Sequence, residues 1–449
     1  MKKLLSILVL NLLLSGSAYS WEWTESAFNE WLKNSGSNKR MGCENPPRSI
    51  YCYDENNNPL WKKKENNLKV KVYGRSLNIP EYINKKKVKP NYETLMFYLY
   101  RYNNGPPKTR PYYEIKASKS FFQFKFDLRE DEYIKKQMQK TALLSYLLYE
   151  NGKIKIDEIT PKDRFGMLFN NDTKYVSNSV GKSFVSYILG HAICGGYIES
   201  VDSKLNDWPL LENTLYYDQK IIDLINMNAG DYEYFDKGGN FKKSRKHPSD
   251  YSVSDVIGSD LISSKKSKPK YKYNNFTTNI IHNYIVFKTK DNYAEILNNI
   301  FNDKAKIKNS IYLFEKKRGQ DDVKSHKSKS YTFYVSRYDY LRVAKAMMDD
   351  WQNDTCEGKY LKSLYERKIK KNKKDYRDKH EAFSNTKSYG GFFHLDPSGM
   401  KNRHIFIMDG YGGQTLTIDF DRKRIVTTMA VHRNFNWKKI AHSVIKKGE

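Results

Sequence analysis

The chain has 449 residues, of which 79 are Lys or Arg and 51 are Asp or Glu, so its formal net charge is +28 at neutral pH. This length exceeds one ordinary domain, so two lobes, or a domain with an extension, are expected. The lysines are spread along the whole chain, which indicates a solvated surface rather than a specific nucleic-acid site. Unspecific attraction to an anionic envelope surface is expected instead.

Residues 1–20 have the pattern of a secretory signal peptide. Lys2 and Lys3 precede an apolar run from Leu4 to Leu14, and Ala18-Tyr19-Ser20 supplies small residues for cleavage before Trp21. No later segment offers 18 uncharged apolar residues that could span a membrane. The mature protein is therefore expected to be exported, to the periplasm or the extracellular space.

The four cysteines give a weak indication of an oxidising compartment. Cys43 and Cys52 lie in a Pro- and Asn-rich loop and could form a disulfide, whereas Cys194 and Cys356 are expected to be free thiols. No His or Cys pair has the spacing of metal ligands. Neither a metal nor another cofactor is expected.

Residues 21–130 are interpreted as an N-terminal extension that packs on the main body. The segment is rich in Asn, Lys, Pro and Tyr, and its periodicity predicts only short strands, such as Leu68 to Tyr73 and Phe121 to Phe126. It carries no motif that can be assigned to chemistry.

Regular structure is predicted from Asp131 onward. A helix is expected from Glu132 to Lys140, followed by strands over 142–149 and 153–159. Asn151-Gly152 joins the two strands, and Asn-Gly is the strongest short hairpin signal. The main sheet is expected to start with this hairpin.

The segment around Ser179 combines a nucleophile with a buried helix. Ser179 and Lys182 are three residues apart, so both lie on one face of a helical turn, where the amine could take the hydroxyl proton. Apolar residues then recur at helical spacing up to Gly195-Gly196, which ends the helix. Ser-x-x-Lys recurs elsewhere in this lysine-rich chain, so the alternative is an N-capping serine with a surface lysine.

The remaining chain is predicted to be mostly helix and loop over about 199–389, with the sheet resuming near the C-terminus. Helical patterns cover 218–227, 253–262, 277–288, 335–352 and 359–370. Strands are expected over 405–408, 414–420 and 424–431, and a closing helix over 437–447. These patterns predict an α/β (α+β) fold: an antiparallel sheet built from both ends of the domain, flanked by helices, with a mostly helical lobe.

The order of these parts, over about Asp131 to Lys447, resembles the serine β-lactamase and penicillin-binding-protein superfamily. The resemblance is closest to its class C-like branch of esterases and amide hydrolases, including hydrolases of 6-aminohexanoate oligomers. It is carried by Ser177-Asn-Ser-Val-Gly-Lys-Ser-Phe184, which resembles the family form Ser-x-Ser-x-x-Lys-Ser-Phe. The resemblance implies one serine hydrolase domain over 131–449.

The second family motif, Tyr-x-Asn, is matched by Tyr273-Asn274-Asn275. The resemblance implies that Tyr273 exchanges protons with Lys182 and Ser179, and that Asn275 orients Lys182 or a substrate amide oxygen. A phenol near an ammonium group is expected to have a lowered pKa, which would suit Tyr273 as a base. The alternative is a chance match or a helix cap.

The third family motif is best matched by Tyr411-Gly412-Gly413, followed by Gln414. Small residues there let a strand approach the substrate, and the backbone N–H groups of Ser179 and Gln414 would form an oxyanion hole. The alternative is a simple glycine turn between strands. Tyr411 stands where the family has Lys or His, so the cation that binds a substrate carboxylate is missing.

These observations predict an exported serine hydrolase that forms an acyl-enzyme on a small ester or linear amide. The altered third motif favours an esterase or amidase over a β-lactamase or D-Ala carboxypeptidase. Two alternatives stay open: a catalytically inactive member of the family that binds a ligand or the envelope, and a basic surface-binding protein.

Overall fold

The computed structural model describes residues 67–72, 75–80, 111–161, 169–236, 239–248, 251–316, 327–372, 382–400, 402–430, 433 and 435–447. The expected signal segment and the Cys43–Cys52 pair lie outside these residues. Among the described residues, no helix is both long enough and apolar enough to cross a membrane.

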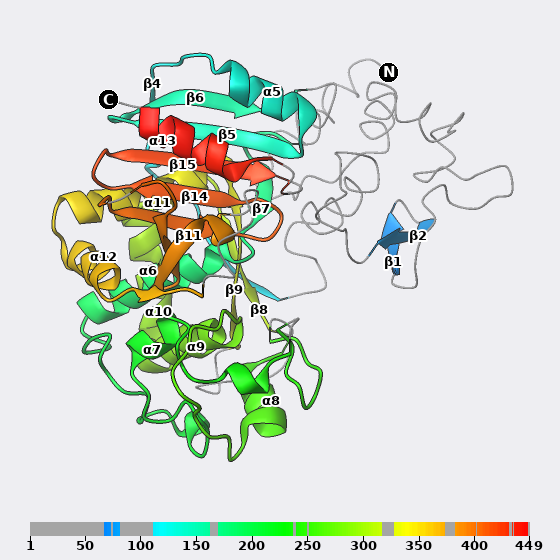
Figure 1. Ribbon diagram of the computed structural model, residues 1–449, viewed down its shortest axis with the longest axis vertical. Helices are drawn as coiled ribbons and strands as arrows, with labels where there is room; N and C mark the ends of the chain where they lie inside the picture. Colours follow the sequence, from blue (N-terminus) through cyan, green and yellow to red (C-terminus); the bar gives the residue numbers. More distant parts are fainter. Residues whose placement is uncertain are drawn as a thin grey trace, which may run out of the picture.

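A nine-stranded sheet forms the centre of the molecule (Figure 1). Its strands, in spatial order, are β10 (Ile369–Lys370), β11 (Thr386–Gly390), β12 (Phe393–Pro397), β13 (Ile405–Asp409), β14 (Thr415–Asp419), β15 (Arg424–Ala430), β5 (Leu143–Glu150), β6 (Lys153–Ile159) and β4 (Lys125–Phe126). All neighbours are antiparallel except β4 and β6. The C-terminal strand β15 pairs with β5, with Arg424 opposite Glu150, so both ends of the domain build the sheet as predicted.

A second sheet of four antiparallel strands lies beside the helical lobe. Its order is β3 (Tyr112–Ile115), β8 (Ile311–Glu315), β9 (Lys329–Ser336) and β7 (Lys174–Val176). A separate hairpin pairs β1 (Asn67–Val72) with β2 (Arg75–Pro80), where the sequence predicts a strand from Leu68. Residues of β3 and β4 pair with strands of the main body, whereas the domain boundary near residue 130 stays a prediction.

Helices pack against the large sheet and make up the helical lobe (Figure 1). They are α5 (Glu132–Lys140), α6 (Val180–Cys194), α7 (Ile221–Ile225), α8 (Val253–Val256), α9 (Phe276–Thr289), α10 (Tyr293–Asn298), α11 (Arg337–Gln352), α12 (Cys356–Glu366) and α13 (Ser443–Lys447). Single π-helical segments extend three of them, at Ile257–Leu261, Asn299–Lys304 and Lys438–His442. Short 3₁₀ turns occur at Pro209–Leu211, Tyr232–Tyr234, Lys290–Asn292 and Phe383–Asn385.

The two faces of the sheet belong to two apolar clusters. Residues of α5 and the C-terminal helical segment, such as Ile134 and Ile440, pack with Leu143 and Leu148 of β5. The opposite face of β5, including Leu147, belongs to the larger cluster that also contains α6, α9 and α11. In Figure 1, α13 crosses in front of β5 and β15, and the helical lobe extends from the far end of the sheet. The nucleophile helix α6 is thus a core helix, as its apolar run predicts.

Several predicted elements match closely and others do not. The helix Glu132–Lys140 and the hairpin at Asn151-Gly152 are as predicted. The segment 199–389, which is predicted to be mostly helix and loop, also contains β8, β9, β10 and most of β11. The expected strand over Phe121–Phe126 is reduced to Lys125–Phe126.

A buried arginine and a buried aspartate at the start of α11 hold neighbouring loops. The Arg337 guanidinium donates to Ser145 Oγ (2.6 Å) and Asp157 Oδ1 (2.6 Å) in the first hairpin. Asp339 accepts from the backbone N–H of Lys308 (2.7 Å) at the start of the β8 segment. Both side chains are structural.

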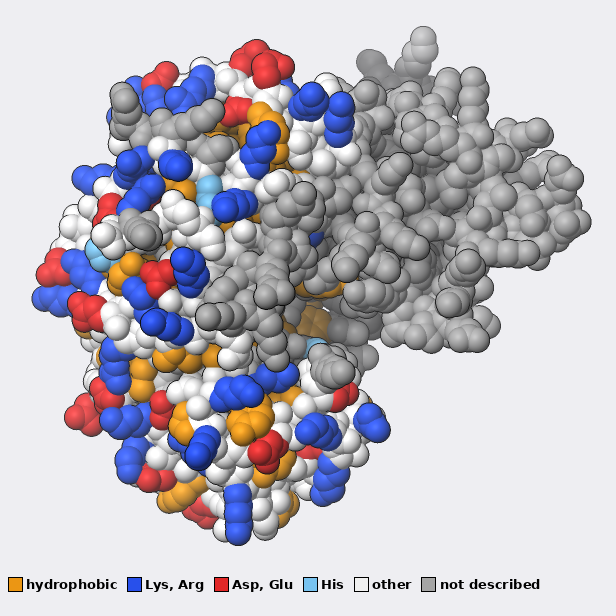
Figure 2. Space-filling view, viewed as in Figure 1, with side chains coloured by type: hydrophobic (Ala, Val, Ile, Leu, Met, Phe, Trp, Pro, Cys, Tyr) orange, Lys and Arg blue, Asp and Glu red, His pale blue; other side chains and the backbone are white. Residues whose placement is uncertain are grey.

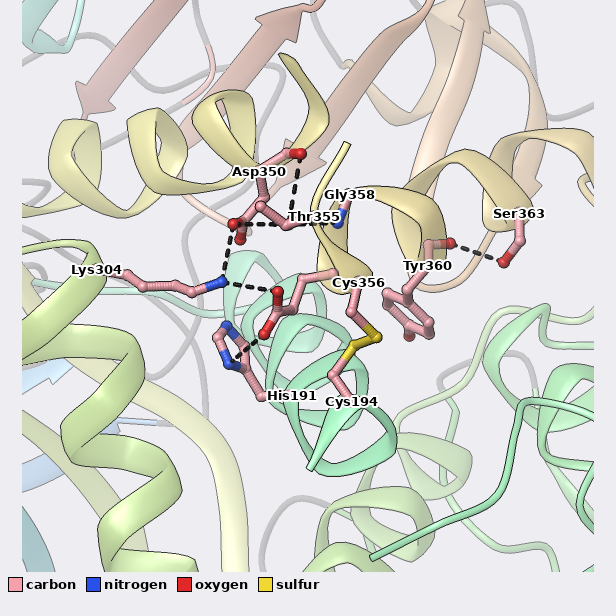
Figure 3. The surroundings of a disulfide bond; sticks show 10 residues. His191, Cys194, Lys304, Asp350, Thr355, Cys356, Gly358, Tyr360 and Ser363 are labelled. Atoms are coloured by element: carbon pink, nitrogen blue, oxygen red, sulfur yellow. Dashed lines mark hydrogen bonds and ion pairs between the residues drawn. A yellow bond between two sulfur atoms is a disulfide. The ribbon is translucent and has the colours of Figure 1, made fainter. Parts of the chain in front are cut away.

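The expectation that Cys194 and Cys356 are free thiols is wrong. They form a disulfide, with Cα atoms 5.8 Å apart, between the last residue of α6 and the first residue of α12 (Figure 3). Beside it, Lys304 Nζ lies 2.8 Å from a carboxylate oxygen of both Asp350 and Glu357, and Glu357 also pairs with His191. Cys194 and Cys356 are 162 residues apart in sequence, so the spacing of the cysteines could not reveal the disulfide.

Removing this disulfide should lower the free energy of unfolding. Because the bond closes a loop of 162 residues, the chain-entropy model assigns it roughly 5 kcal/mol, chiefly through the unfolded state. Guanidinium denaturation of Cys194→Ser, Cys356→Ser and the double variant measures the loss. The double variant should lose no more than either single variant, and single variants of unchanged stability would contradict the bond.

Candidate active site

Ser179 occupies the N-cap position of α6, at the junction of the helical lobe with both sheets. Its side chain makes no capping hydrogen bond to the helix and is only half-buried. The interpretation of Ser179 as an ordinary capping serine therefore does not hold. A serine at this position also lies at the positive end of the helix dipole.

Lys182 is 1 % exposed and lies within reach of the serine. Its Nζ is 3.3 Å from Ser179 Oγ and donates to Asn275 Oδ1 at 2.6 Å. Nζ also lies over the ring of Tyr331, 3.6 Å from the ring centroid. The interpretation of Lys182 as a surface lysine is therefore wrong.

Burial decides the protonation state of Lys182. Removal from water lowers the pKa of the ammonium group well below its ordinary value, because burial disfavours the charged form. A neutral amine has two N–H donors and one lone pair. One N–H bonds Asn275 and the other can face the Tyr331 ring, which leaves the lone pair for the Ser179 hydroxyl.

Tyr273 lies on the other side of the serine. Burial raises the pKa of its phenol, although a hydrogen bond with Ser179 partly opposes the shift. The expected lowering of the Tyr273 pKa by a neighbouring ammonium is therefore wrong, because Lys182 itself loses charge on burial. The geometry gives the two groups opposite roles: a neutral amine that can accept a proton and a phenol that can donate one.

The Tyr273-Asn274-Asn275 segment divides its work between neighbouring asparagines. Asn274 caps α9, because its Oδ1 accepts from the N–H groups of Phe276 (2.9 Å) and Thr277 (3.0 Å). Asn275 is thereby left to face Lys182, and its Nδ2 lies 3.4 Å from His247 Nε2. Of the two expected roles for Asn275, the structure favours the orientation of Lys182.

The glycine-rich turn after β13 is pressed against the start of α6. A Cβ on Gly410 would lie 2.5 Å from the Ser177 carbonyl oxygen, and Asn178 Nδ2 donates to the Tyr411 carbonyl. The turn therefore lies beside Ser179, as the third motif predicts. The Tyr411 side chain is half-buried, and its carbonyl rather than a cationic side chain holds the contact.

Gly413 and Gln414 form the end of this turn. Gly413 has a φ of +101°, and its carbonyl accepts from Thr428 Oγ1 at 3.2 Å. The Gln414 side chain is buried and donates to the Ala430 carbonyl at 3.1 Å, so it points into the sheet. Only the backbone of Gln414 is therefore available for the oxyanion role that the sequence assigns to it.

Sequence reasoning missed four residues beside these groups: Tyr331, Asn178, His247 and His394. Tyr331 lies on the unpredicted strand β9, and Asn178 adopts a φ of +46° that places its amide on Tyr411. His394 stacks on Tyr273, with ring centroids 6.0 Å apart and planes at 24°. Asn178 lies at a variable position of the Ser177–Phe184 motif, and the other three belong to no spaced motif. Only the folded chain brings those three to the site.

No group of three or more His, Cys, Asp and Glu side chains is placed to hold a metal ion in the described part of the chain. Lys and Arg side chains are spread over the visible face among Asp and Glu (Figure 2). That distribution matches a solvated surface rather than one basic patch.

Comparisons with known proteins support the fold. A candidate 6-aminohexanoate-dimer hydrolase from Bacillus anthracis superposes with a TM-score of 0.55 at 14 % identity, covering 81 % of this chain and 95 % of that one. A candidate β-lactamase from Bacteroides dorei DSM 17855 gives 0.51 at 12 % identity, covering 71 % and 97 %. Both superpositions show that this chain has the same fold as these two proteins, in agreement with the fold that the resemblance implies. No protein-family model and no curated protein matches the sequence.

Replacing Gly413 by Ala should destabilise the turn beside Ser179. A Cβ there would lie 2.9 Å from Ala430 Cβ and 3.0 Å from the Phe435 ring, in addition to the positive φ. Gly399 is a matched control, because its φ is +90° but nothing lies within 4 Å of a Cβ. Gly399→Ala should cost about 1–3 kcal/mol of unfolding free energy for the backbone alone.

Gly413→Ala should cost roughly 1–3 kcal/mol more than Gly399→Ala, because overpacking adds to the backbone strain. Denaturant unfolding of the two variants gives the difference. Equal losses would contradict the close packing at Gly413.

Proposed function

We propose that this protein is a serine hydrolase that forms an acyl-enzyme on an ester or linear amide. The observation that carries the proposal is the contact of the buried Lys182 amine with Ser179, 3.3 Å from Nζ to Oγ. Tyr273 faces the same serine, and the site stays open because Ser179 is only half-buried. A nucleophile, a base and an acid thus meet at one accessible point.

The first half of the reaction forms the acyl-enzyme. The Lys182 amine accepts the Ser179 proton as Oγ attacks the carbonyl carbon, and the carbonyl oxygen becomes an oxyanion between the N–H groups of Ser179 and Gln414. The Tyr273 phenol donates its proton to the leaving oxygen or nitrogen as that bond breaks. The Lys182 ammonium then gives its proton to the neighbouring Tyr273 phenolate, whose ring centroid lies 5.3 Å from Nζ, and both groups are restored.

Water completes the cycle by the same groups. It loses a proton to Lys182 and attacks the acyl carbon, and the acid is released as Ser179 Oγ takes a proton from Tyr273. The Lys182 ammonium then returns a proton to Tyr273, which restores the starting state. Asn275 holds the amine throughout through its 2.6 Å hydrogen bond.

The altered third motif supports an ester or linear amide as substrate. Tyr411 offers a hydroxyl and a carbonyl where a cation would bind the carboxylate of a lactam or a C-terminal D-amino acid. The Bacillus anthracis neighbour carries the name of a hydrolase that acts on 6-aminohexanoate dimer. The same motif favours the alternative of a non-catalytic binding protein, which the labelling experiment below separates from the enzyme.

An exported protein fits two observations. Residues 1–20 have a signal-peptide pattern, and the disulfide between Cys194 and Cys356 is of a kind that persists in oxidising compartments. We place the protein in the periplasm or the extracellular space, where its positive charge would attract it unspecifically to anionic surfaces.

A Ser179→Ala variant should lose all labelling by a fluorophosphonate probe and keep its fold. The probe reacts with an activated serine, and only Ser179 has an amine in contact with its oxygen among the Ser-x-x-Lys pairs that the structure describes. Ser263→Ala is the matched control, since Ser263 also begins a Ser-x-x-Lys pair but is exposed. Mass spectrometry detects the bound probe in each variant, and circular dichroism reports whether the fold is kept. An unlabelled wild-type chain would favour the binding protein, and labelling that persists in Ser179→Ala would refute the assignment.

Activity should fall as the pH falls through the pKa of Lys182. Because burial lowers that pKa, the amine is neutral and reactive above it, and protonation below it removes the base. The raised Tyr273 pKa keeps the phenol protonated well into the alkaline range, so the alkaline loss should come late. The dependence of kcat/KM on pH with a chromogenic acetate ester measures both limbs.

The dependence of kcat/KM on pH also tests whether Lys182, rather than another group, causes the loss of activity at acidic pH. Lys182→Arg places a cation that stays protonated at every accessible pH, so this variant should be inactive throughout. A variant that retained the wild-type acidic limb would contradict the role of Lys182 as the base.

A further inference from the structure

His394 on β12 is a buried imidazole that the mechanism above does not use. It is 3 % exposed, and its ring lies nearly parallel to that of Tyr273, with the centroids 6.0 Å apart. The rings of Phe383 and Tyr389 pack against it edge-on, at 5.0 and 4.9 Å. The imidazole is therefore fixed in place next to the proposed acid of the reaction.

A buried lysine determines which nitrogen of His394 carries the proton. Lys371 is 4 % exposed; its Nζ donates to Phe383 O (2.7 Å) and Thr386 Oγ1 (2.5 Å) and lies 3.0 Å from His394 Nδ1. Three polar partners around Nζ suit an ammonium group, which has three donors and no acceptor, and Nδ1 supplies a lone pair to such a group. The proton of the neutral ring then lies on Nε2, and its N–H points away from Lys371.

The surroundings keep this imidazole neutral. Burial, followed by the charges of Lys371 and Arg433, lowers the pKa of His394 well below its ordinary value. Arg433 lies beside the glycine turn of the site, because its guanidinium donates to Asp409 at 2.7 Å. Histidine that is neutral with a fixed tautomer acts as a single directed donor.

Among the residues that the structure describes, the hydrogen bond of His394 is the one at Nδ1, so its Nε2–H group is available to a ligand. Its neighbour Tyr273 is the group that gives a proton to the leaving group in the proposed reaction. A donor stacked on Tyr273 is therefore placed to meet the leaving-group side of a substrate rather than its acyl side.

We infer that His394 is a substrate-binding residue whose Nε2–H donates a hydrogen bond to a carboxylate or carbonyl oxygen on the leaving group. The inference rests on the proposed function for the direction of the substrate. Lys371, held one hydrogen bond behind the ring, adds positive potential, so a carboxylate is bound better than a neutral oxygen. His394, which lies on β12, thus supplies part of the carboxylate binding that a cation at the position of Tyr411 would give.

Two esters that differ only in such an oxygen test the inference. Butyrate esters of 3-hydroxybenzoate and of 3-methylphenol share the scissile bond and the ring, and only the first carries a carboxylate. His394→Phe keeps an aromatic ring on Tyr273 and removes the donor, whereas His394→Gln keeps an N–H donor and removes the ring.

The expected result is a loss specific to one ester. His394→Phe should lower kcat/KM for the 3-hydroxybenzoate ester by about tenfold to a hundredfold, mainly through KM, and for the other ester by less than about threefold. His394→Gln should recover part of the preference. Equal losses on both esters, or a loss confined to kcat, would overturn the inference and leave His394 as a packing residue.

Lys371→Met tests the control of the tautomer. It should reduce the preference for the 3-hydroxybenzoate ester, because the proton is no longer confined to Nε2. Lys387→Met is the matched control, since it removes an exposed cation from the neighbouring strand β11. A preference that falls equally in both variants would assign the effect to general charge rather than to His394.

A binding measurement separates this inference from the proposed function. In the Ser179→Ala chain, ¹⁵N spectra of histidine report the tautomer and its response to 3-hydroxybenzoate without any turnover. The Nε2–H form should be observed, and its resonance should shift with 3-hydroxybenzoate but not with 3-methylphenol. The Nδ1–H form, or no selective shift, would overturn the inference even if Ser179 proved catalytic, and a selective shift would support it even if the chain proved inactive.

Discussion

The burial of one amine is the constraint on which the site depends. Lys182 lies in the core, and no acidic partner opposes the lowering of its pKa by burial. An ammonium group in that position would cost several kcal/mol of desolvation without a counter-charge, so the native state favours the neutral amine. The same burial that packs the helix therefore creates a base, and the polar groups around it are those that a neutral amine can use.

Close backbone contact makes this burial possible. A Cβ on Gly181 would lie 1.7 Å from the Tyr331 carbonyl oxygen, so glycine lets β9 lie directly against the first turn of α6. Ser177 fixes the same contact, because its Oγ accepts from the Phe333 N–H at 2.9 Å and its own N–H donates to the Phe333 carbonyl at 2.7 Å. The Tyr331 ring is thereby placed under the Lys182 amine. The small residues of the Ser-rich motif thus have a packing role besides their chemical one.

Local patterns predicted much of the fold. The Asn151-Gly152 turn, the apolar run after Lys182 and the alternation in the C-terminal strands identify the sheet and the nucleophile helix, because each is a short-range property of the chain. Strands β11 and β12 were not predicted from the sequence. They are joined at Gly391-Phe392, both with positive φ, and a phenylalanine at that position gives no turn signal. Strand β9 was not predicted because no turn separates it from α11, whose N-cap is Ser336.

The candidate site was predictable only where a motif carried it. Ser179, Lys182, Tyr273 and Asn275 stand in recognisable spacing, and the structure brings them together. The direction of the Tyr273 pKa was not predictable, since it depends on how far burial removes the charge from Lys182. The disulfide and the Lys371–His394 pair join residues whose proximity only the tertiary fold determines.

The position of β15 has a consequence for how the molecule is completed. This strand lies between β14 and β5, in the middle of the large sheet, although it comes from the last part of the chain. When the ribosome has already synthesised α6, β15 is still missing from the nascent chain. The hairpin of β5 and β6 therefore cannot yet be joined to β14. Loss of a short C-terminal stretch would remove the centre of the sheet rather than its margin, so the two halves of the domain would separate where the pairing is most extensive.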